Sequence, residues 1–265
     1  MSREQAEFLN IRFERTGPRA DLIINRPEKR NALNAATIAE LLRAFEICKA
    51  DPAVRVVVLS GAGDKAFCAG ADLAENMQPM NEYLRLVQRE NFTGLFKIIP
   101  NLGKPVIGQV QGLALAGGCG LAASCDFVIA SETARFGTPE VNVGLFPMMI
   151  SAILLRNLGR KKAYDLMFTG RQIDALEAER IGLVTRVVPA AQLKAEVDTL
   201  AADLAAKSPA VLKLGKDAIQ KADQMPFNEA LDYLSTMLSM NFLTADAKEG
   251  MTAFLEKRAP EWKGE

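Results

Sequence analysis

The feature that most constrains the fold is a glycine-rich turn between an apolar run and a stretch of small residues. Residues 105–111 (Pro-Val-Ile-Gly-Gln-Val-Gln) predict a buried strand, and residues 112–118 then carry glycine at three positions. Residues 120–125 predict a short helix, and residues 126–130 predict a second strand. A glycine turn that opens a helix leaves free backbone N–H groups and lets a bound group approach closely. The same turn can also serve only to pack a helix on a sheet.

Strand and helix patterns alternate up to about residue 190, and helical patterns alone follow. Residues 8–14 and 20–25 predict an opening hairpin. The other predicted elements are a helix through residues 38–48, a strand at 55–60, a helical stretch at 74–100 interrupted at 77–80, a short strand within 134–147, helices at 148–158, from 159 and at 175–181, a strand at 183–188, and helices near 191–206, 209–222, 227–242 and 244–257. The pattern predicts an α/β core, residues 1–190, with a helical C-terminal region, residues 191–265.

Composition excludes several classes of function. Lys plus Arg and Asp plus Glu number 32 each, so no global field favours nucleic acid or anionic membrane. The chain has no histidine, which excludes Ser-His-Asp and Cys-His catalysis and histidine-based metal sites. Any acid–base chemistry must therefore come from carboxylates, lysine, tyrosine, cysteine or the backbone, and we expect no bound metal.

The sequence also predicts where in the cell the protein is located. No apolar run is long enough to cross a bilayer, and residues 1–7 lack the apolar core of a signal peptide. The cysteines show no Cys-x-x-Cys spacing and stand in apolar or glycine-rich surroundings; they are Cys48, Cys68, Cys119 and Cys125. These features predict a cytoplasmic protein with reduced thiols.

Several loops in a fixed order resemble the enoyl-CoA hydratase/isomerase family, also called the crotonase superfamily. The matching stretches are Asn-Arg-Pro at 25–27 with Asn-Ala-Leu-Asn at 31–34, residues 66–72, residues 112–126, Phe-Gly-Thr-Pro-Glu at 136–140, Gly-Leu at 144–145, Gly-Leu-Val at 182–184, and residues 250–258. The resemblance implies a spiral of ββα units and a helical C-terminal region that forms trimers, with hexamers built from two trimers. It implies an acyl-CoA substrate and no separate cofactor, since CoA is part of the substrate.

In that family, two backbone N–H groups bind the thioester oxygen of the acyl-CoA. The matching positions are Ala71, which follows Ala69 and Gly70, and Gly117, which precedes Gly118. Reactions beside a thioester place negative charge on the carbonyl oxygen, and two fixed donors at a helix N-terminus stabilise that charge. Backbone donors need no reactive side chain, so small residues mark such a site.

The resemblance also implies contacts with CoA. The adenine end is expected over residues 65–73 of one subunit, a loop that includes Lys65, Phe67, Asp72 and Leu73, with Lys29 or Arg30 near phosphate. A neighbouring subunit is expected to complete the site. Its terminal helix would present Phe254 and Lys257, which are three residues apart and therefore share a helix face.

Family hydratases carry two glutamates that hold a water molecule, and this chain matches only the second, Glu140. The first position is Gly120, which has no side chain. One carboxylate can still take a proton from the alpha carbon of a 3-enoyl-CoA and return it to the gamma carbon. We therefore expect a 3-enoyl-CoA to 2-enoyl-CoA isomerase with Glu140 as its single acid–base residue.

Other possibilities remain open. A hydratase could replace the missing acid with Glu75, Asp72 or Glu132. The chain could also bind acyl-CoA without catalysis, or bind RNA through the basic run at 160–162, although such runs are usually solvated and no nucleic-acid partner is expected. A dehalogenase would need an aspartate where Met148 and Met149 stand, and a peptidase of the related fold would need histidine.

Overall fold

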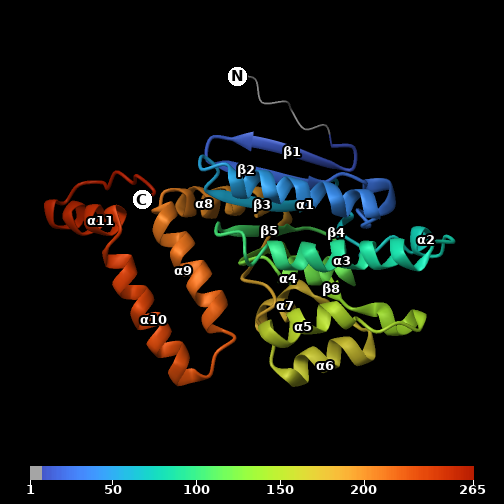
Figure 1. Cartoon of the computed structure of the whole chain (residues 1–265). Helices are drawn as coiled ribbons and strands as arrows, with labels where there is room; N and C mark the ends of the chain where they lie inside the picture. The colour runs from blue at the N-terminus through green and yellow to red at the C-terminus, as the bar shows by residue number, and fades with distance from the viewer. Residues whose placement is uncertain (1–7) are drawn as a thin grey trace.

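A six-stranded sheet forms the centre of the molecule in the computed structural model, which describes residues 8–265 (Figure 1). Its strands, in spatial order, are β1 Ile11–Thr16, β2 Arg19–Ile24, β3 Val56–Gly61, β5 Val106–Val110, β7 Phe127–Ser131 and β10 Arg186–Val188. The β1–β2 pair is the expected antiparallel hairpin, and every later pair is parallel. The prediction made for residues 1–7 lies outside the described part of the chain.

A second, four-stranded sheet lies beside the first. It contains β4 Ala66–Cys68, β6 Leu113–Leu115, β8 Arg135–Gly137 and β9 Gln172–Asp174, with β9 antiparallel to β8. The chain alternates between the sheets, since β3, β5 and β7 of the large sheet are followed by β4, β6 and β8 of the small one. Each turn of the chain thus adds one strand to both sheets, and the expected spiral of ββα units is confirmed.

Helices fill the space around these sheets. The first α-helix is α1 Ala35–Ala50, which begins where the Asn34 side chain accepts a hydrogen bond of 2.8 Å from the N–H of Thr37. Its buried face, which includes Leu41, Phe45 and Cys48, follows the helical spacing seen in the sequence. The remaining helices of the core are η1 Pro27–Lys29, α2 Leu73–Asn76, α3 Glu82–Ile98, α4 Gly117–Ala123, η2 Pro139–Val143, α5 Met148–Asn157, α6 Arg160–Thr169, α7 Ala175–Arg180, η3 Ala190–Gln192 and α8 Leu193–Ala205.

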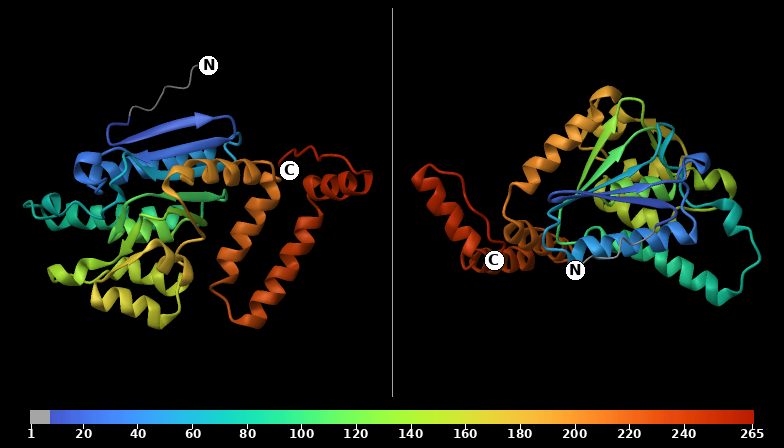
Figure 2. Two further views of the ribbon diagram at one scale, coloured as in Figure 1. Left: turned by 180° about the vertical axis from the view of Figure 1, so that it is seen from behind. Right: turned by 90° about the horizontal axis from the view of Figure 1, so that it is seen from above.

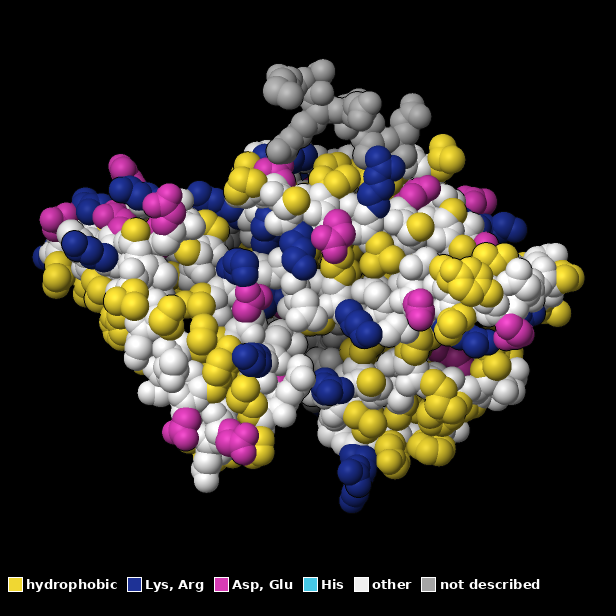
Figure 3. Space-filling model, in the orientation of Figure 1, with side chains coloured by type: hydrophobic (Ala, Val, Ile, Leu, Met, Phe, Trp, Pro, Cys, Tyr) yellow, Lys and Arg dark blue, Asp and Glu magenta, His cyan; other side chains and the backbone are white. Residues whose placement is uncertain are grey.

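The last three helices leave the core as an arm. Figures 1 and 2 show α9 Pro209–Ala222, α10 Phe227–Phe242 and α11 Ala245–Glu256 projecting to one side, whereas α8 packs on the large sheet. The base of the arm is anchored by Lys216, whose ammonium lies 2.6 Å from the Asp126 carboxylate. Hydrophobic side chains gather along the arm in Figure 3, and Phe227, Leu243 and Phe254 are mostly exposed.

The structure corrects several sequence-based boundaries. Helix α4 begins at Gly117, three residues before the predicted start, and the predicted strand at 183–188 is limited to β10. The small-sheet strands β4, β6 and β9 were not predicted, because three residues are too few to show an alternating pattern. No helix within residues 8–265 is both long and apolar enough to cross a bilayer.

Candidate active site

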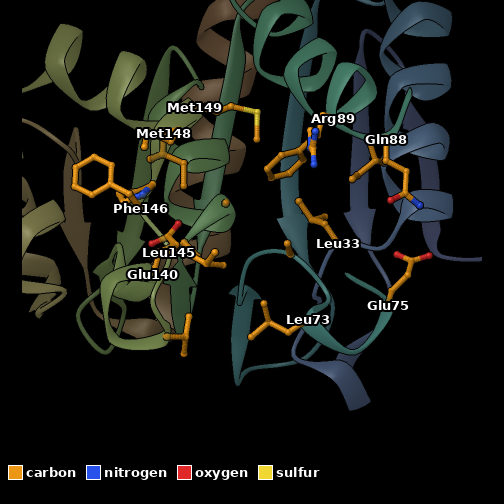
Figure 4. Close-up of a pocket in the computed structure, with 18 of the residues that line it drawn as sticks. Leu33, Leu73, Glu75, Gln88, Arg89, Glu140, Leu145, Phe146, Met148 and Met149 are labelled. Carbon is orange, nitrogen blue, oxygen red and sulfur yellow. The ribbon is translucent and has the colours of Figure 1, made fainter. Parts of the chain in front are cut away.

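A cavity of about 700 Å³ opens between α3, the loop that precedes α2, and the segment from η2 to α5 (Figure 4). One wall is apolar and comes from the start of α5 and the residues before it. The opposite wall comes from α2 and α3 and carries most of the polar side chains. The side chains that the argument below uses are Ala71, Leu73, Glu75, Arg85, Gln88, Arg89, Phe92, Gly117, Glu140, Leu145, Phe146, Met148, Met149 and Ile150.

Glu140 lies in the first turn of η2, which follows strand β8 of the small sheet. The η2 segment closes at Gly144, whose φ of +76° is readily available to glycine. Burial raises the pKa of Glu140 above its ordinary value, and a backbone hydrogen bond offsets part of this effect. The Oε2 atom is buried and has no hydrogen-bond partner within the described part of the chain. The carboxyl group is therefore desolvated and available to a substrate.

The N-terminus of α4 approaches the loop that carries Ala71. A Cβ atom built on Gly70, whose φ is +101°, would lie 2.7 Å from Cβ of Ala116 and 3.3 Å from the backbone nitrogen of Gly117. Glycine at position 70 is thus required for this close approach. Residues 8–265 offer no hydrogen-bond partner to the N–H of Ala71 or to that of Gly117. Two unpaired donors therefore lie close together on residues that both line the cavity.

The position of the missing family acid is occupied by apolar groups. A Cβ atom on Gly120 would lie 3.0 Å from Cγ1 of Ile150 and 3.2 Å from Cε1 of Phe96. A side chain at position 120 would therefore be accommodated only if Ile150 or Phe96 moved.

Of the acids considered as substitutes, Glu75 alone lines the cavity, on the side opposite Glu140 (Figure 4). Its Oε2 atom accepts a hydrogen bond of 2.9 Å from the N–H of Ala35, at the N-terminus of α1. Asp72 instead forms an ion pair of 3.0 Å with Arg26, which holds the pKa of Asp72 below its ordinary value against the opposing effect of burial. Glu132 follows β7 and does not line the cavity.

The structure separates the residues expected to contact CoA into three groups. Ala69, Ala71, Leu73 and Gly117 line the cavity. Gly70 and Gly118 hold backbones close together, since a Cβ on Gly118 would collide with the carbonyl of Cys68. The others lie outside the cavity. Phe67 is fully buried in the core, and Asp72 pairs with Arg26. The exposed residues are Lys29, Arg30 and Lys65, which lie beside the loop, and Phe254 and Lys257, which lie at the end of α11.

The sequence analysis did not identify the residues that α3 contributes. Arg85, Gln88, Arg89 and Phe92 all line the cavity from one face of this helix. Their spacing of three, four and seven residues was a signal that could have found them, because such residues share a helical face. Because three of these four residues are polar, their shared face does not show the apolar periodicity that marks a buried helix face.

The cysteines near the cavity are not reactive groups. Burial raises the thiol pKa of Cys68 and of Cys119 to about 12, so both remain protonated at neutral pH. Residues 8–265 contain no group of three or more Cys, Asp or Glu side chains placed to hold a metal ion.

Comparison with known proteins assigns the family. The model of the enoyl-CoA hydratase/isomerase family matches residues 20–265, and the chain belongs to this family. The sequence is 43% identical to a probable enoyl-CoA hydratase of Rhizobium meliloti, over 91% of this chain and 93% of that protein. It is 41% identical to the crotonyl-CoA hydratase of Syntrophomonas wolfei, over 95% of this chain and 96% of that protein.

The fold agrees with solved structures of the family. The crystal structure of an enoyl-CoA hydratase from Bacillus anthracis superposes with a TM-score of 0.92 at 35% identity, covering 97% of this chain and all of that one. The human enoyl-CoA hydratase domain-containing protein 3 superposes equally well, with a TM-score of 0.92 at 33% identity over 96% of this chain and 100% of that chain. The crotonase fold and a hydratase/isomerase type of enzyme are therefore established for this chain.

Proposed function

We propose that the protein adds water to a 2-enoyl-CoA thioester, with Glu140 as the acid–base residue. The observation that carries the proposal is the buried, unpartnered carboxylate oxygen of Glu140, which shares a cavity with the unpaired N–H groups of Ala71 and Gly117. The N–H groups would bind the thioester oxygen and stabilise the charge that develops there. Donors placed in this way contribute roughly 3 kcal/mol each to transition-state stabilisation.

One carboxylate suffices for the proposed addition if it acts twice. Glu140 would accept a proton from water while the water oxygen bonds to the beta carbon, and the electron pair of the double bond would move toward the thioester oxygen. Glu140 would then donate the proton to the alpha carbon and return to its charged form. A pKa raised by burial suits this role, because a group that both accepts and donates works best when its pKa is near the working pH.

Hydration takes precedence over the isomerisation expected from the sequence because the similar proteins are named as hydratases. They include the Syntrophomonas wolfei protein and the short-chain-enoyl-CoA hydratase of Clostridium acetobutylicum, which is 40% identical over 95% of this chain. The preference rests on those names, since the site itself accommodates either reaction.

Isomerisation of a 3-enoyl-CoA is the second candidate, and one observation favours it. Ile150 and Phe96 close the space beside Gly120, so the first glutamate of the two-glutamate arrangement has no place there. Proton transfer between two carbons of one substrate needs only Glu140. If hydration uses a second acid, Glu75 is the carboxylate that could approach from across the cavity.

Turnover of matched 2-enoyl-CoA and 3-enoyl-CoA substrates by the wild type, Glu140→Gln and Glu75→Gln tests the proposal. We expect the 2-enoyl-CoA to be hydrated, and we expect Glu140→Gln to lose about a hundredfold or more in kcat while it still binds acyl-CoA. Glu75→Gln should keep most activity if Glu140 acts alone, and a large loss would identify Glu75 as a second acid. Near-normal turnover by Glu140→Gln would exclude its catalytic role, and faster conversion of the 3-enoyl-CoA would establish the isomerase instead.

We also propose that the protein assembles as a homotrimer or a dimer of trimers in the cytoplasm. Support comes from the apolar side chains that the arm exposes, including Phe227, Leu231 and Leu238, which a monomer would leave in water. The molar mass measured by light scattering tests this assembly, and a monomer at micromolar concentration would contradict it.

A further inference from the structure

We propose that the acyl group of the substrate ends in a carboxylate, which Arg89 and Arg85 bind at the α3 wall of the cavity. This inference rests on the proposed binding of an acyl-CoA and adds the chemical class of its acyl chain. The observation behind it is the polarity of the α3 face that lines the cavity.

The cavity face of α3 begins at Phe92 and becomes polar toward the start of the helix. The ring of Phe92 lies close above the N-terminus of α4, with one carbon 2.6 Å from the position of a Cβ on Gly117. Phe92 therefore marks the end of the cavity where the thioester oxygen would bind. Arg89 precedes it by three residues and Arg85 by seven, which places them about 4.5 Å and about 10.5 Å further along the helix axis. A six-carbon acyl chain and an arginine side chain together span such a distance.

The two guanidinium groups are poorly paired with the protein itself. Arg85 has a contact of 3.8 Å with the exposed Glu82 and a hydrogen bond of 3.3 Å to the carbonyl of Met80. For the Arg89 guanidinium, residues 8–265 supply no ion pair within 4.0 Å. Glu75 also lines the cavity, and its Oε2 atom is bonded to the N–H of Ala35 at the start of α1.

Gln88 adds an amide to the same wall and is half-buried. In Figure 4, Gln88 and Arg89 lie on the side of the cavity opposite Glu140 and Met148. Arg85 is half-buried like Gln88, whereas Arg89 is exposed at the cavity wall. An apolar acyl chain along this wall would remove part of their water without supplying a partner, which is unfavourable. A terminal carboxylate would instead accept charge-assisted hydrogen bonds from guanidinium and amide.

The opposite wall fits the middle of such a chain. It consists of hydrocarbon and sulfur from Leu145, Phe146, Met148 and Met149, which would pack on the methylene groups. The cavity thus offers two donors for the thioester oxygen, an apolar wall for the chain, and cationic groups for its far end. These three kinds of group follow one another along the cavity in the order that an enoyl thioester of a dicarboxylic acid requires.

The test measures binding of two saturated ligands, hexanedioyl-CoA and hexanoyl-CoA, by calorimetry. These ligands have the same number of acyl carbons and differ in the terminal carboxylate, and neither can be turned over. We expect the wild type to bind hexanedioyl-CoA about tenfold more tightly, and we expect Arg89→Gln to remove most of this preference without weakening hexanoyl-CoA. Arg85→Gln should remove part of it.

Arg160→Gln is the matched control, because Arg160 is exposed on α6 and lies outside the cavity. Equal wild-type affinity for the two ligands, or no binding of either, would overturn the inference. Equal weakening of both ligands by Arg89→Gln would also overturn it, since Arg89 would then hold the CoA portion. A binding preference without any enoyl-CoA turnover would contradict the proposed function alone, and turnover without a preference would contradict this inference alone.

Discussion

Ile150 packs directly over Gly120, and its Cγ1 atom lies 3.0 Å from the position that a Cβ atom on the glycine would take. The contact joins α4 to the start of α5 and leaves no room for a longer side chain. Where the family hydratases carry the first glutamate, this chain therefore has a glycine covered by apolar side chains.

Gly120→Glu alone should destabilise the protein without increasing hydration, because its carboxylate would be forced against Ile150 and Phe96. The double variant Gly120→Glu/Ile150→Ala removes the nearer obstacle and should hydrate 2-enoyl-CoA about tenfold or more faster than Ile150→Ala. Thermal melting and initial rates measure the two effects. A stable Gly120→Glu variant with increased hydration would show that the α5 side chain moves aside readily.

Glu140→Gln should stabilise the protein at neutral pH. The carboxyl pKa is raised by burial above its ordinary value of 4.5, so the folded state holds the proton more tightly than the unfolded state. The stability contributed by this proton is complete below pH 4.5 and is lost as the pH rises through the raised pKa. The melting temperature of Glu140→Gln relative to wild type should therefore increase from pH 4 to pH 7.

Glu249→Gln is a control in which the effect of the substitution on stability should have the opposite sign. Hydrogen bonds from Arg258 lower the pKa of Glu249 to about 2, so its contribution is present above the ordinary value and is lost as the pH falls toward 2. This variant should be less stable than wild type at neutral pH, and the difference should shrink in acid. Parallel pH profiles for the two variants would contradict the assigned directions.

Gly170→Ala should displace the η2 segment, which carries Glu140, and thereby reduce kcat. Gly170 ends α6 with a φ of +63°, and a Cβ there would lie 2.8 Å from Cγ2 of Val141 and 3.0 Å from Nδ2 of Asn142. Displacement of these neighbours would move Glu140 and lower kcat about tenfold or more, with a smaller effect on KM. Gly17→Ala has a similar φ of +58° and no atom within 4 Å of the new Cβ, so it controls for backbone strain alone. Equal kinetics of the two variants would exclude a positioning role.

Lys257→Ala should weaken the binding of a CoA ester if the terminal helix of one subunit completes the site of another. The effect should be larger at low salt than at high salt, because an exposed charge is screened. Lys248→Ala removes another exposed charge, from within α11, and should leave affinity unchanged. Unaltered affinity of an intact Lys257→Ala oligomer would reject the role of this lysine.

The sequence predicted the features that depend on local pattern. The helix with Leu41 and Phe45 and the long strands were found because their apolar spacing is regular. Ala71, Gly117 and Glu140 could be placed near one another through the order of the family motifs. The proximity itself depends on three loops that are distant in sequence, and no local pattern encodes it.

The sequence could not predict how side chains pack across the cavity. Gly120 and Ile150 are thirty positions apart, and their contact exists because α5 crosses α4. The sequence pattern predicts Arg89 to be an ordinary surface residue. Its position in the cavity wall depends on the direction that α3 takes across the molecule. Glu75, considered as a substitute acid, lines the cavity opposite Glu140 because Ala35 at the start of α1 fixes its side chain.

The strand order of the large sheet has a consequence for how the chain folds as it is made. The strands β1, β2, β3, β5, β7 and β10 stand in space in the same order as in the sequence. Each strand therefore adds to an edge formed by a segment that leaves the ribosome earlier. The growing edge is exposed to other chains until β10 pairs with β7, with Arg186 opposite Ile129. Nascent chains that stop before β10 should accordingly be the aggregation-prone species during synthesis.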